Sequence, residues 1–331
     1  MLVLPIKSID LTEHPEKWAD FFHKTWPFYE RWFLKEGLFA REGYLSSLTE
    51  FEKYLPALLP TYKRLCEEIG GGDLASRYLS MYCPPPYMSG CSQIAWIKDN
   101  PSLIRNYDYS PRYFEGVFMK TDFIKPVMGM SECNWGLLDG VNSDGLCASL
   151  TFGGRRITGN GFGIPIVLRY CLETCATTIE AIEILKSIPV HMSYNITLLD
   201  AHLNFATIYM VPNAENLVTS YQVGTNHQGE ITWSDYAIMT RTVERLNLLE
   251  HSLYNPSETS KSLKNRFLQS PLYNTAFSKA FGTLYTASYS PEKSEVELIW
   301  PSKSLTLNLE NFEETKVQVN LKTNANRLLT I

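Results

Sequence analysis

The chain has 331 residues, 44% of them hydrophobic and 13% aromatic, and a formal net charge of -5. This composition predicts a globular protein with enough apolar material for one large domain or two small ones. Lysines and arginines are scattered, which excludes an extended nucleic-acid groove. No apolar run reaches the roughly 18 residues that a transmembrane helix needs. The charged residues that follow Ile6 do not fit a signal peptide, so we expect a cytoplasmic protein.

The first 90 residues are expected to be mostly helical. Between residues 13 and 34 the aromatic side chains recur at helical spacing, which indicates amphipathic helices with a break near Pro27. The same spacing continues over residues 49–69, where three glycines end it. An aromatic face of this size requires a partner surface, so we expect the segment to pack permanently against the rest of the chain.

A proline-rich connector, residues 83–90, leads directly to Cys91. Cys91 begins an apolar run that ends at Trp96, a polar turn follows, and a second extended run contains Arg105 and Asp108. This order is typical of a β-hairpin, which would bring the two charged residues back beside the cysteine. A thiol with an ordinary pKa of about 8.5 needs a base or a nearby positive charge to act as a nucleophile. The hairpin supplies the charge and leaves the base open.

Helical and strand patterns follow this hairpin in turn. We expect strands within residues 124–152 around a turn at residues 139–146, and a helix that starts near Pro165 and runs to residue 175. Later patterns predict strands over 193–199, 205–211 and 217–223, a helix over 240–249, a hairpin over 282–300, and a last edge strand or tail over 301–331. Together they indicate the α+β class with antiparallel strands.

Neither the cysteines nor the histidines form a disulfide or metal pattern. The seven cysteines are Cys66, Cys83, Cys91, Cys133, Cys147, Cys171 and Cys175. An odd number in a long chain does not indicate a disulfide framework. Cys171 and Cys175 share one face of an expected helix, and we interpret them as core residues. The six histidines have no His-x-x-x-His spacing, so we expect no metal ion and no other cofactor.

Four stretches together resemble a known family. They are Gly90-Cys91, Arg105-Asn106-Tyr107-Asp108, the turn at residues 139–146, and Thr225-Asn226-His227. In these stretches the chain is similar to N-terminal-nucleophile hydrolases of the acyl-coenzyme A:6-aminopenicillanic acid acyltransferase type. Choloylglycine hydrolases, penicillin V acylases and acid ceramidase are more distant relatives. The resemblance covers roughly residues 91–300 and implies a four-layer αββα sandwich, with two facing antiparallel sheets between helices. It also implies that a second helix over residues 178–187 follows the one that starts near Pro165.

The resemblance also implies how the missing base arises. Members of the family cut themselves before the cysteine, here between Gly90 and Cys91, and the freed α-amine serves as the base. The ordinary pKa of an α-amine, about 7.7 to 8.0, suits proton transfer near neutral pH. Residues 1–90 would then form an α chain that stays associated with a catalytic β chain of residues 91–331.

Three further site residues are implied by the resemblance. Asn226 would donate from its side chain to the oxyanion, and Arg241 would follow it, with Arg245 one helical turn later as the alternative match. Asn142, in the turn at 139–146, would contribute to the oxyanion or substrate pocket. His227 is the candidate base of a different, papain-like Cys-His arrangement; a structural hydrogen bond is the other interpretation.

The expected activity is cleavage of a linear, non-peptide amide through an acyl thioester at Cys91. Arg105 would favour the thiolate, and Asp108 would orient the α-amine. The expected partner is a small-molecule acyl amide. If an amine replaced water as the group that attacks the thioester, the chain would be an N-acyltransferase, for which acyl-coenzyme A could be the donor. A second alternative is an unprocessed, non-catalytic binding protein of the same fold. The sequence leaves open the substrate, the choice between hydrolysis and transfer, and whether the Gly90–Cys91 bond is cut.

Overall fold

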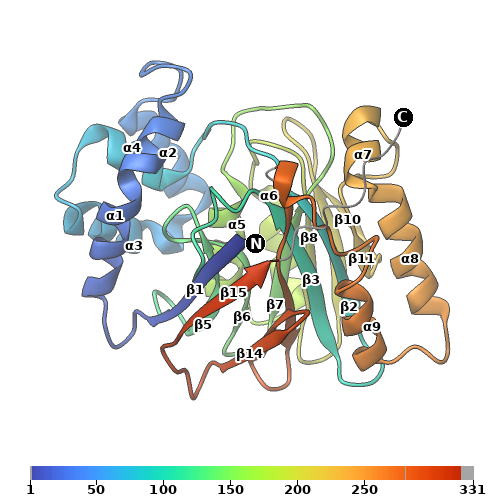
Figure 1. Ribbon diagram of the computed structural model, residues 1–331. Coiled ribbons are helices and arrows are strands. Elements are labelled where there is room, and N and C mark those ends of the chain that lie inside the picture. Colours follow the sequence, from blue (N-terminus) through green and yellow to red (C-terminus); the bar gives the residue numbers. More distant parts are fainter. Residues whose placement is uncertain (1, 280, 322–331) are drawn as a thin grey trace.

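The computed structural model describes residues 2–279 and 281–321. Within these residues the chain forms two β-sheets that pack face to face, with helices against their outer faces (Figure 1). The predicted α+β class and its αββα layering are therefore confirmed. Within the same residues, no helix is both long enough and apolar enough to cross a membrane.

The larger sheet holds nine strands among the described residues. In sheet order they are β10 (Leu217–Thr219), β9 (Phe205–Met210), β8 (Tyr194–Leu199), β7 (Cys147–Phe152), β6 (Gly136–Asn142), β5 (Val127–Glu132), β4 (Val117–Thr121), β1 (Leu2–Asp10) and β15 (Lys316–Leu321). Neighbouring strands are antiparallel, except that β1 and β4 are parallel. From β4 to β9 each strand therefore pairs with the next one along the chain, as short connections favour.

The smaller sheet holds six strands in the same part of the chain. In sheet order they are β11 (Val223–Gly224), β2 (Gly90–Trp96), β3 (Ser102–Tyr109), β12 (Gly282–Ser290), β13 (Glu295–Trp300) and β14 (Lys303–Asn308). β2 and β3 form the predicted hairpin that begins at Cys91, and β12 and β13 form the second predicted hairpin. β2 packs across the sandwich against β7 and β8, which places the start of the hairpin in the interior.

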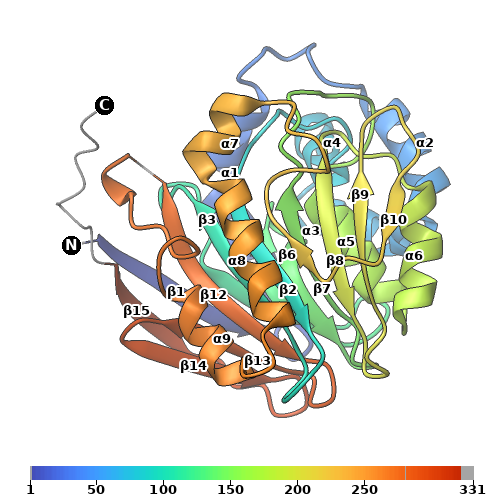
Figure 2. The ribbon, with the colours of Figure 1, turned by 90° about the vertical axis from the view of Figure 1, so that its right-hand side faces the viewer.

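Helices cover both outer faces of the sandwich (Figure 2). α5 (Ile164–Thr174) and α6 (Thr178–Ser187) lie on the larger sheet, whereas α8 (Thr242–Tyr254) and α9 (Ser260–Phe267) lie on the smaller one. α7 (Ser234–Thr240) immediately precedes α8. A separate apolar cluster fills the space under α8 and α9: Ile94, Trp96, Ile104, Val223, Leu249, Leu263, Phe267 and Leu272. Burial of these side chains fixes both helices on the smaller sheet.

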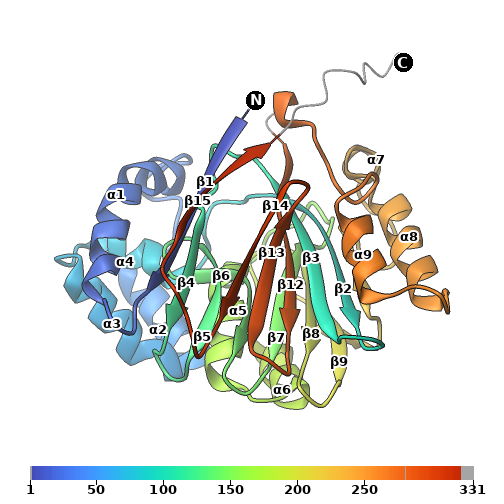
Figure 3. The same cartoon turned by 60° about the horizontal axis from the view of Figure 1, so that its bottom comes forward.

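The helices between β1 and β2 form a group beside the larger sheet (Figure 3), whereas the short 3₁₀ helix η2 (Phe277–Lys279) precedes β12. The group consists of α1 (Glu16–Phe33), α2 (Tyr44–Tyr54), the short 3₁₀ helix η1 (Pro56–Leu58), α3 (Leu59–Glu68) and α4 (Asp73–Ser80). The expected break of α1 near Pro27 is wrong, because α1 runs through this residue. An internal proline costs a helix about 3 kcal/mol. Burial of Phe22 and Tyr29 on one face of α1 offsets this cost.

The sequence also missed the strand β1, because residues 1–90 were expected to be mostly helical. β1 lies inside the larger sheet, between β4 and β15. Leu4 and Ile6 are buried while Val3 is exposed, which is the alternation of a strand with one covered face. The N-terminal segment therefore contributes to the sheet itself as well as to the helical group.

The expected strand over residues 217–223 is divided between the two sheets. β10 ends at Thr219 in the larger sheet, and β11 begins at Val223 in the smaller one, where it pairs with β2. This crossing delivers the residues after Gly224 to the start of β2. At the C-terminal end, residues 303–308 and 316–321 form β14 and β15, two strands rather than one, and residues 322–331 lie outside the described residues.

Candidate active site

Arg105 and Asp108 both lie beside Cys91, but on opposite faces of the smaller sheet. In the β2–β3 hairpin, Cys91 is opposite Tyr107 and Gly90 is opposite Asp108. Because side chains alternate along a strand, Arg105 and Cys91 point into the sandwich, whereas Asp108 points toward the outer side that carries α8. The predicted hairpin thus brings both charged residues to the cysteine from two directions.

The Cys91 thiol is fully buried and contacts one cation. Nη2 of Arg105 donates a hydrogen bond to Cys91 Sγ at 3.1 Å. Burial raises the pKa of the Cys91 thiol, and this effect outweighs the opposing influence of Arg105. Burial therefore favours the neutral thiol, and the neighbouring guanidinium would stabilise its thiolate form.

Asp139 orients this guanidinium and was not recognised as a site residue in the sequence. Arg105 Nη1 donates to Asp139 Oδ2 at 2.6 Å, and both side chains are fully buried. The hydroxyls of Tyr285 and Tyr289 donate to the same carboxylate, that of Tyr285 at 2.5 Å. The sequence analysis placed Asp139 at the start of a turn, but it lies inside β6. A carboxylate within the apolar run 137–141 was the available signal.

Asn226 contacts the backbone on both sides of Gly90. Its Oδ1 accepts a hydrogen bond from the backbone N–H of Cys91 at 2.9 Å. Its Nδ2 donates to the carbonyl oxygen of Ser89 at 3.3 Å and to that of Phe152 at 3.1 Å. The hydroxyl of Tyr236 donates to the same Ser89 oxygen at 2.6 Å. Asn226 and Tyr236 together hold the residue that precedes the predicted cleavage site.

Arg245 holds the other side of Asn226. Its Nη2 donates to Asn226 Oδ1 at 2.6 Å, and its Nη1 donates to Ser92 Oγ at 2.8 Å and to the carbonyl oxygen of Cys91. The Arg245 side chain is fully buried. These contacts fix the oxygen of the Asn226 amide toward Cys91 and its nitrogen toward Ser89.

Asp108 provides a buried carboxyl on the outer side of the hairpin. Thr283 Oγ1 donates to Asp108 Oδ1 at 2.6 Å. Burial raises the pKa of Asp108 to about 6, although Arg245, the Thr283 hydrogen bond and Arg105 act in the opposite direction. Asp108 is therefore charged at neutral pH and loses its charge in mild acid.

A comparison of the sequence with known families shows which family the chain belongs to. Residues 96–305 match the family described as acyl-coenzyme A:6-aminopenicillanic acid acyl-transferase. The chain belongs to this family. The resemblance inferred from the sequence is confirmed, and the matched region includes Arg105, Asp108 and Asn226 but begins after Cys91. No curated protein matches the chain.

Solved structures of three enzymes resemble this acyl-transferase family member at low sequence identity. Penicillin V acylase from Agrobacterium tumefaciens is 13% identical, with 67% of this chain and 78% of that chain covered and a TM-score of 0.41. A conjugated bile acid hydrolase mutant from Clostridium perfringens is 14% identical, with 72% of this chain and 99% of that chain covered and a TM-score of 0.40. The Caenorhabditis elegans ortholog of N-acylethanolamine-hydrolyzing acid amidase is 16% identical, with 61% of this chain and 93% of that chain covered and a TM-score of 0.43. At these TM-scores the similarities support no conclusion on their own.

Arg241, the first choice for the arginine after Asn226, lies outside this cluster. It stands between α7 and α8 in a left-handed conformation with φ of 53°, which turns its side chain to the surface. There its Nε donates to Glu244 at 2.7 Å and its Nη1 to Ser270 at 3.0 Å. The left-handed residue at Arg241 interrupts the helix between α7 and α8, and Arg245, in the first turn of α8, is the arginine that reaches Asn226.

Asn142 also lies away from the Cys91 cluster and has a structural environment. Its Nδ2 donates to the carbonyl oxygens of Leu172 at 2.9 Å and Cys175 at 2.7 Å. Its Oδ1 accepts from the backbone N–H of Asp144 and of Leu146. All its hydrogen-bonding groups thus join the β6–β7 turn to the end of α5, which leaves none for an oxyanion.

His227 follows Asn226 but does not face the thiol. Its Nδ1 lies 2.9 Å from Thr242 Oγ1 and 3.3 Å from Thr225 Oγ1. Burial, assisted by Arg245, lowers the pKa of His227. These contacts favour the structural interpretation of this histidine. Among residues 2–279 and 281–321, no three His, Cys, Asp or Glu side chains form a group that could hold a metal ion.

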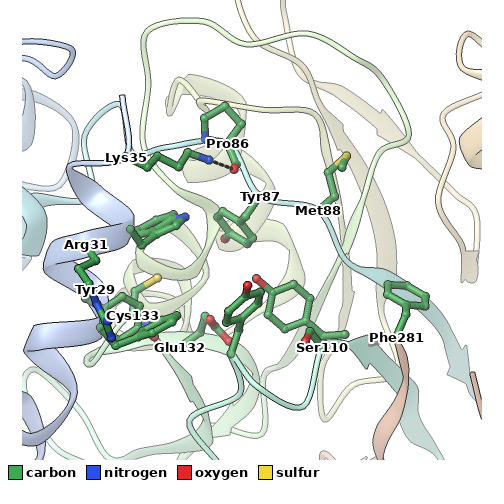
Figure 4. A pocket seen from close by; sticks show the side chains of 14 residues that line it. Tyr29, Arg31, Lys35, Pro86, Tyr87, Met88, Ser110, Glu132, Cys133 and Phe281 are labelled. Carbon is green, nitrogen blue, oxygen red and sulfur yellow. Dashed lines mark hydrogen bonds between the residues drawn. The ribbon is translucent and has the colours of Figure 1, made fainter. Parts of the chain in front are cut away.

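A cavity of about 560 Å³ lies next to the cluster (Figure 4). Its walls are mostly aromatic: Phe28, Tyr29, Trp32, Tyr87, Tyr109 and Tyr113. Phe281 also lines it and approaches Gly90 so closely that a Cβ on Gly90 would lie 2.7 Å from Phe281 Cζ. The cavity therefore adjoins the predicted cleavage site of this family member.

Proposed function

We propose that this chain is a self-cleaving cysteine amidohydrolase that breaks the linear amide bond of a small acyl amide through a thioester on Cys91. The observation that carries the proposal is the pair of contacts made by Cys91. Its Sγ accepts from Arg105 at 3.1 Å, and its backbone N–H donates to Asn226 at 2.9 Å. The family to which the chain belongs is described by an acyl-transfer activity, which supports chemistry at an acyl carbon.

Self-cleavage would begin with attack of Cys91 Sγ on the carbonyl carbon of Gly90. The C–N bond breaks, the thiol proton passes to the departing nitrogen, and a thioester links Gly90 to Sγ. Water then hydrolyses this thioester, which releases the Gly90 carboxylate and restores the thiol. The hydrogen bonds of Tyr236 and Asn226 to the Ser89 carbonyl, at 2.6 and 3.3 Å, support the proposal because they hold the acyl side of the bond.

Turnover of a substrate would use the new α-amine of Cys91 as the base. The amine takes the thiol proton as Sγ attacks the substrate amide, and later gives a proton to the leaving amine. Asn226 Oδ1 and Asp108 would orient the amine, while Arg105 stabilises the thiolate. Departure of residues 89–90 would free Asn226 Nδ2 from the Ser89 carbonyl, so that it can donate to the substrate oxyanion.

The two fragments should remain associated after cleavage. β1 pairs with β4 on one side and with β15 on the other. α1 also buries Trp18, Phe22 and Phe33 against the rest of the protein. Separation of residues 1–90 would expose these apolar surfaces to water, and its free-energy cost keeps the fragments together.

Acyl transfer is the second candidate function, and the family description favours it. The same thioester would then react with an amine instead of water, and an acyl-coenzyme A thioester could serve as the donor. Product analysis with and without an added acceptor amine separates the two activities. A new amide that forms only with the acceptor would assign transfer, and free acid in both cases would assign hydrolysis.

Trapping of the acyl enzyme tests the proposal. The purified protein is incubated with a panel of acyl amides, quenched in acid and analysed by intact mass spectrometry. We expect the mass of one acyl group on the fragment that begins at Cys91, and its loss with hydroxylamine. Cys147→Ala serves as the matched control, because Cys147 is another fully buried cysteine. An adduct that persists in Cys91→Ala would contradict the proposal.

A further inference from the structure

The floor of the cavity carries a buried carboxyl group that forms no ion pair within the described residues, although Arg105 acts on it from a longer distance and opposes the rise of its pKa. Glu132, at the end of β5, is only 5% exposed and lines the cavity from below (Figure 4). Glu115 lies behind it. In residues 2–279 and 281–321, no lysine, arginine or histidine forms an ion pair with either glutamate. Buried carboxylates are normally paired, so this arrangement calls for a partner.

Only one of the two carboxyl groups is available to a ligand. Glu115 accepts hydrogen bonds from Tyr29 at 2.5 Å, from Ser131 at 2.6 Å and from the backbone N–H of Asn134 at 2.8 Å. Glu132 accepts one long hydrogen bond, 3.4 Å from the Tyr107 hydroxyl, within the described part of the chain. Burial and the neighbouring Glu115 raise the pKa of Glu132, so a bound cation would stabilise its ionised form.

The walls of the cavity suit a cation as well. Aromatic faces attract cations, and seven aromatic side chains line this space. The hydroxyls of Tyr87 and Ser110 also belong to the lining, and both are buried without a hydrogen-bond partner in residues 2–279 and 281–321. Lys35 and Arg31 line the cavity too, but both are exposed to solvent, which screens their charges, whereas Glu132 is buried. Nζ of Lys35 donates to the carbonyl oxygen of Pro86 and Nε of Arg31 donates to that of Pro27, both at 3.0 Å.

Tyr107 connects this cavity to the nucleophile. It is directly opposite Cys91 in the β2–β3 hairpin and shares its face of the sheet, while its hydroxyl reaches Glu132. We propose that the cavity holds the acyl group of the substrate, and that the far end of this group carries an ammonium ion that pairs with Glu132. The inference rests on the proposed function, since it assigns a substrate class to the same site: amides of ω-amino acids.

Paired substrates test this inference. Aminocoumarin amides of ω-amino acids of increasing length are compared with amides in which a methyl group replaces each ammonium. For the length that fits, we expect the wild-type kcat/KM to be about tenfold or more higher with the ammonium, since one charge-assisted hydrogen bond supplies this ratio. In Glu132→Gln the preference should fall to about twofold or less, because the charge is lost.

Glu183→Gln is the matched control, because Glu183 lies on α6, far from the cavity, and pairs only with Lys186 among the described residues. It should keep the full preference. Equal rates for the two members of every pair, or a preference that survives in Glu132→Gln, would overturn the inference.

Failure of the proposed function can be recognised separately. If wild-type protein hydrolyses neither series, calorimetric titration with pentylammonium and with 1-pentanol still measures the cavity. Binding of pentylammonium that weakens about tenfold in Glu132→Gln would support the cation site. Absence of pentylammonium binding, or equal binding of the alcohol, would overturn it.

Discussion

Two buried arginines of this chain, Arg105 and Arg169, each pair with a carboxylate, but their remaining N–H groups donate to different kinds of partner. Both side chains are fully buried, and each pairs with a buried carboxylate. Arg105 Nη1 lies 2.6 Å from Asp139, and Arg169 Nη1 lies 2.8 Å from Glu173. A buried ion pair of this kind is by itself weak evidence for function.

The remaining nitrogens separate the two cases. Arg169 donates to Thr121 at 2.8 Å, to Met119 Sδ at 3.2 Å and to the carbonyl oxygen of Trp135, so its donors join α5 to the larger sheet. Arg105 directs Nη2 at the Cys91 thiol, and its Nε has no partner in residues 2–279 and 281–321. A buried arginine whose donors all end on structural groups stabilises the fold, whereas a donor aimed at a thiol indicates chemistry.

The first way to test this contrast is Arg105→Gln. It should remove self-cleavage, because no cation remains beside the thiol, and it should lower the free energy of unfolding by about 3 to 5 kcal/mol, because Asp139 stays buried without its partner. Intact mass and urea unfolding measure the two effects. The double variant Arg105→Gln/Asp139→Asn should recover stability but not cleavage; recovery of cleavage would show that Arg105 acts only through the fold.

Arg169→Gln is the structural counterpart. It should lower the free energy of unfolding by a similar amount, about 3 to 5 kcal/mol, because Glu173 loses its cation. Since Arg169 does not touch the Cys91 cluster, the folded fraction should still cut itself at the wild-type rate. Urea unfolding is measured in the Cys91→Ala background, which keeps every chain whole, and cleavage is followed separately by mass. Loss of cleavage in folded Arg169→Gln would contradict the distinction between a structural role for Arg169 and a chemical role for Arg105.

Asn226→Ala probes the donor that self-cleavage would release. Loss of one oxyanion donor typically costs about 100- to 1,000-fold in kcat, or roughly 3 to 4 kcal/mol. Initial rates on an amide that the cut enzyme hydrolyses give this value. Asn142→Ala is the control, because Asn142 is equally buried but bonds only to structural groups in the described residues. A cut Asn226→Ala enzyme with full activity would remove this assignment.

Asp108 should leave a signature in the pH dependence of stability. Burial holds its folded pKa at about 6, above the ordinary value of 3.8. Its contribution is therefore fully present below pH 3.8 and is lost as the pH rises through 6, a change of up to about 3 kcal/mol. In the Cys91→Ala background, Asp108→Asn should remove this loss between pH 4 and pH 7, as measured by urea unfolding. An identical pH dependence in both proteins would argue against a buried, titrating Asp108.

Local features of the fold and site could be predicted from the sequence. The alternation and turn between Cys91 and Asp108 were sufficient to predict the hairpin, and with it the approach of Arg105 to the thiol. The family resemblance, not any periodicity, pointed to Asn226. The helix at 165–175 was expected from the proline at its start, and the helix at 178–187 was implied by the family resemblance; they agree with α5 and α6 within one residue.

Contacts between segments that are distant in the chain could not be predicted from the sequence. Asp139 and Tyr236 reach the cluster only because the two sheets and α7 come together. The local signal for Asp139, a carboxylate inside an apolar run, does not show which group it faces, and no local pattern marks Tyr236. Arg241 was preferred to Arg245 because the family resemblance implied an arginine shortly after the asparagine. An amphipathic pattern does not reveal the left-handed residue between α7 and α8 that separates the positions of the two arginines. Glu132 likewise becomes notable only once its lack of a cationic partner in the described residues is known.

The most direct test of the account is intact mass spectrometry of the denatured wild-type protein, with N-terminal sequencing of any fragment. The account predicts two pieces, residues 1–90 and residues 91–331, with a free cysteine amine on the larger one and none in Cys91→Ala. A single chain that persists on long incubation, indistinguishable from Cys91→Ala, would contradict self-cleavage and leave the thiol without its base.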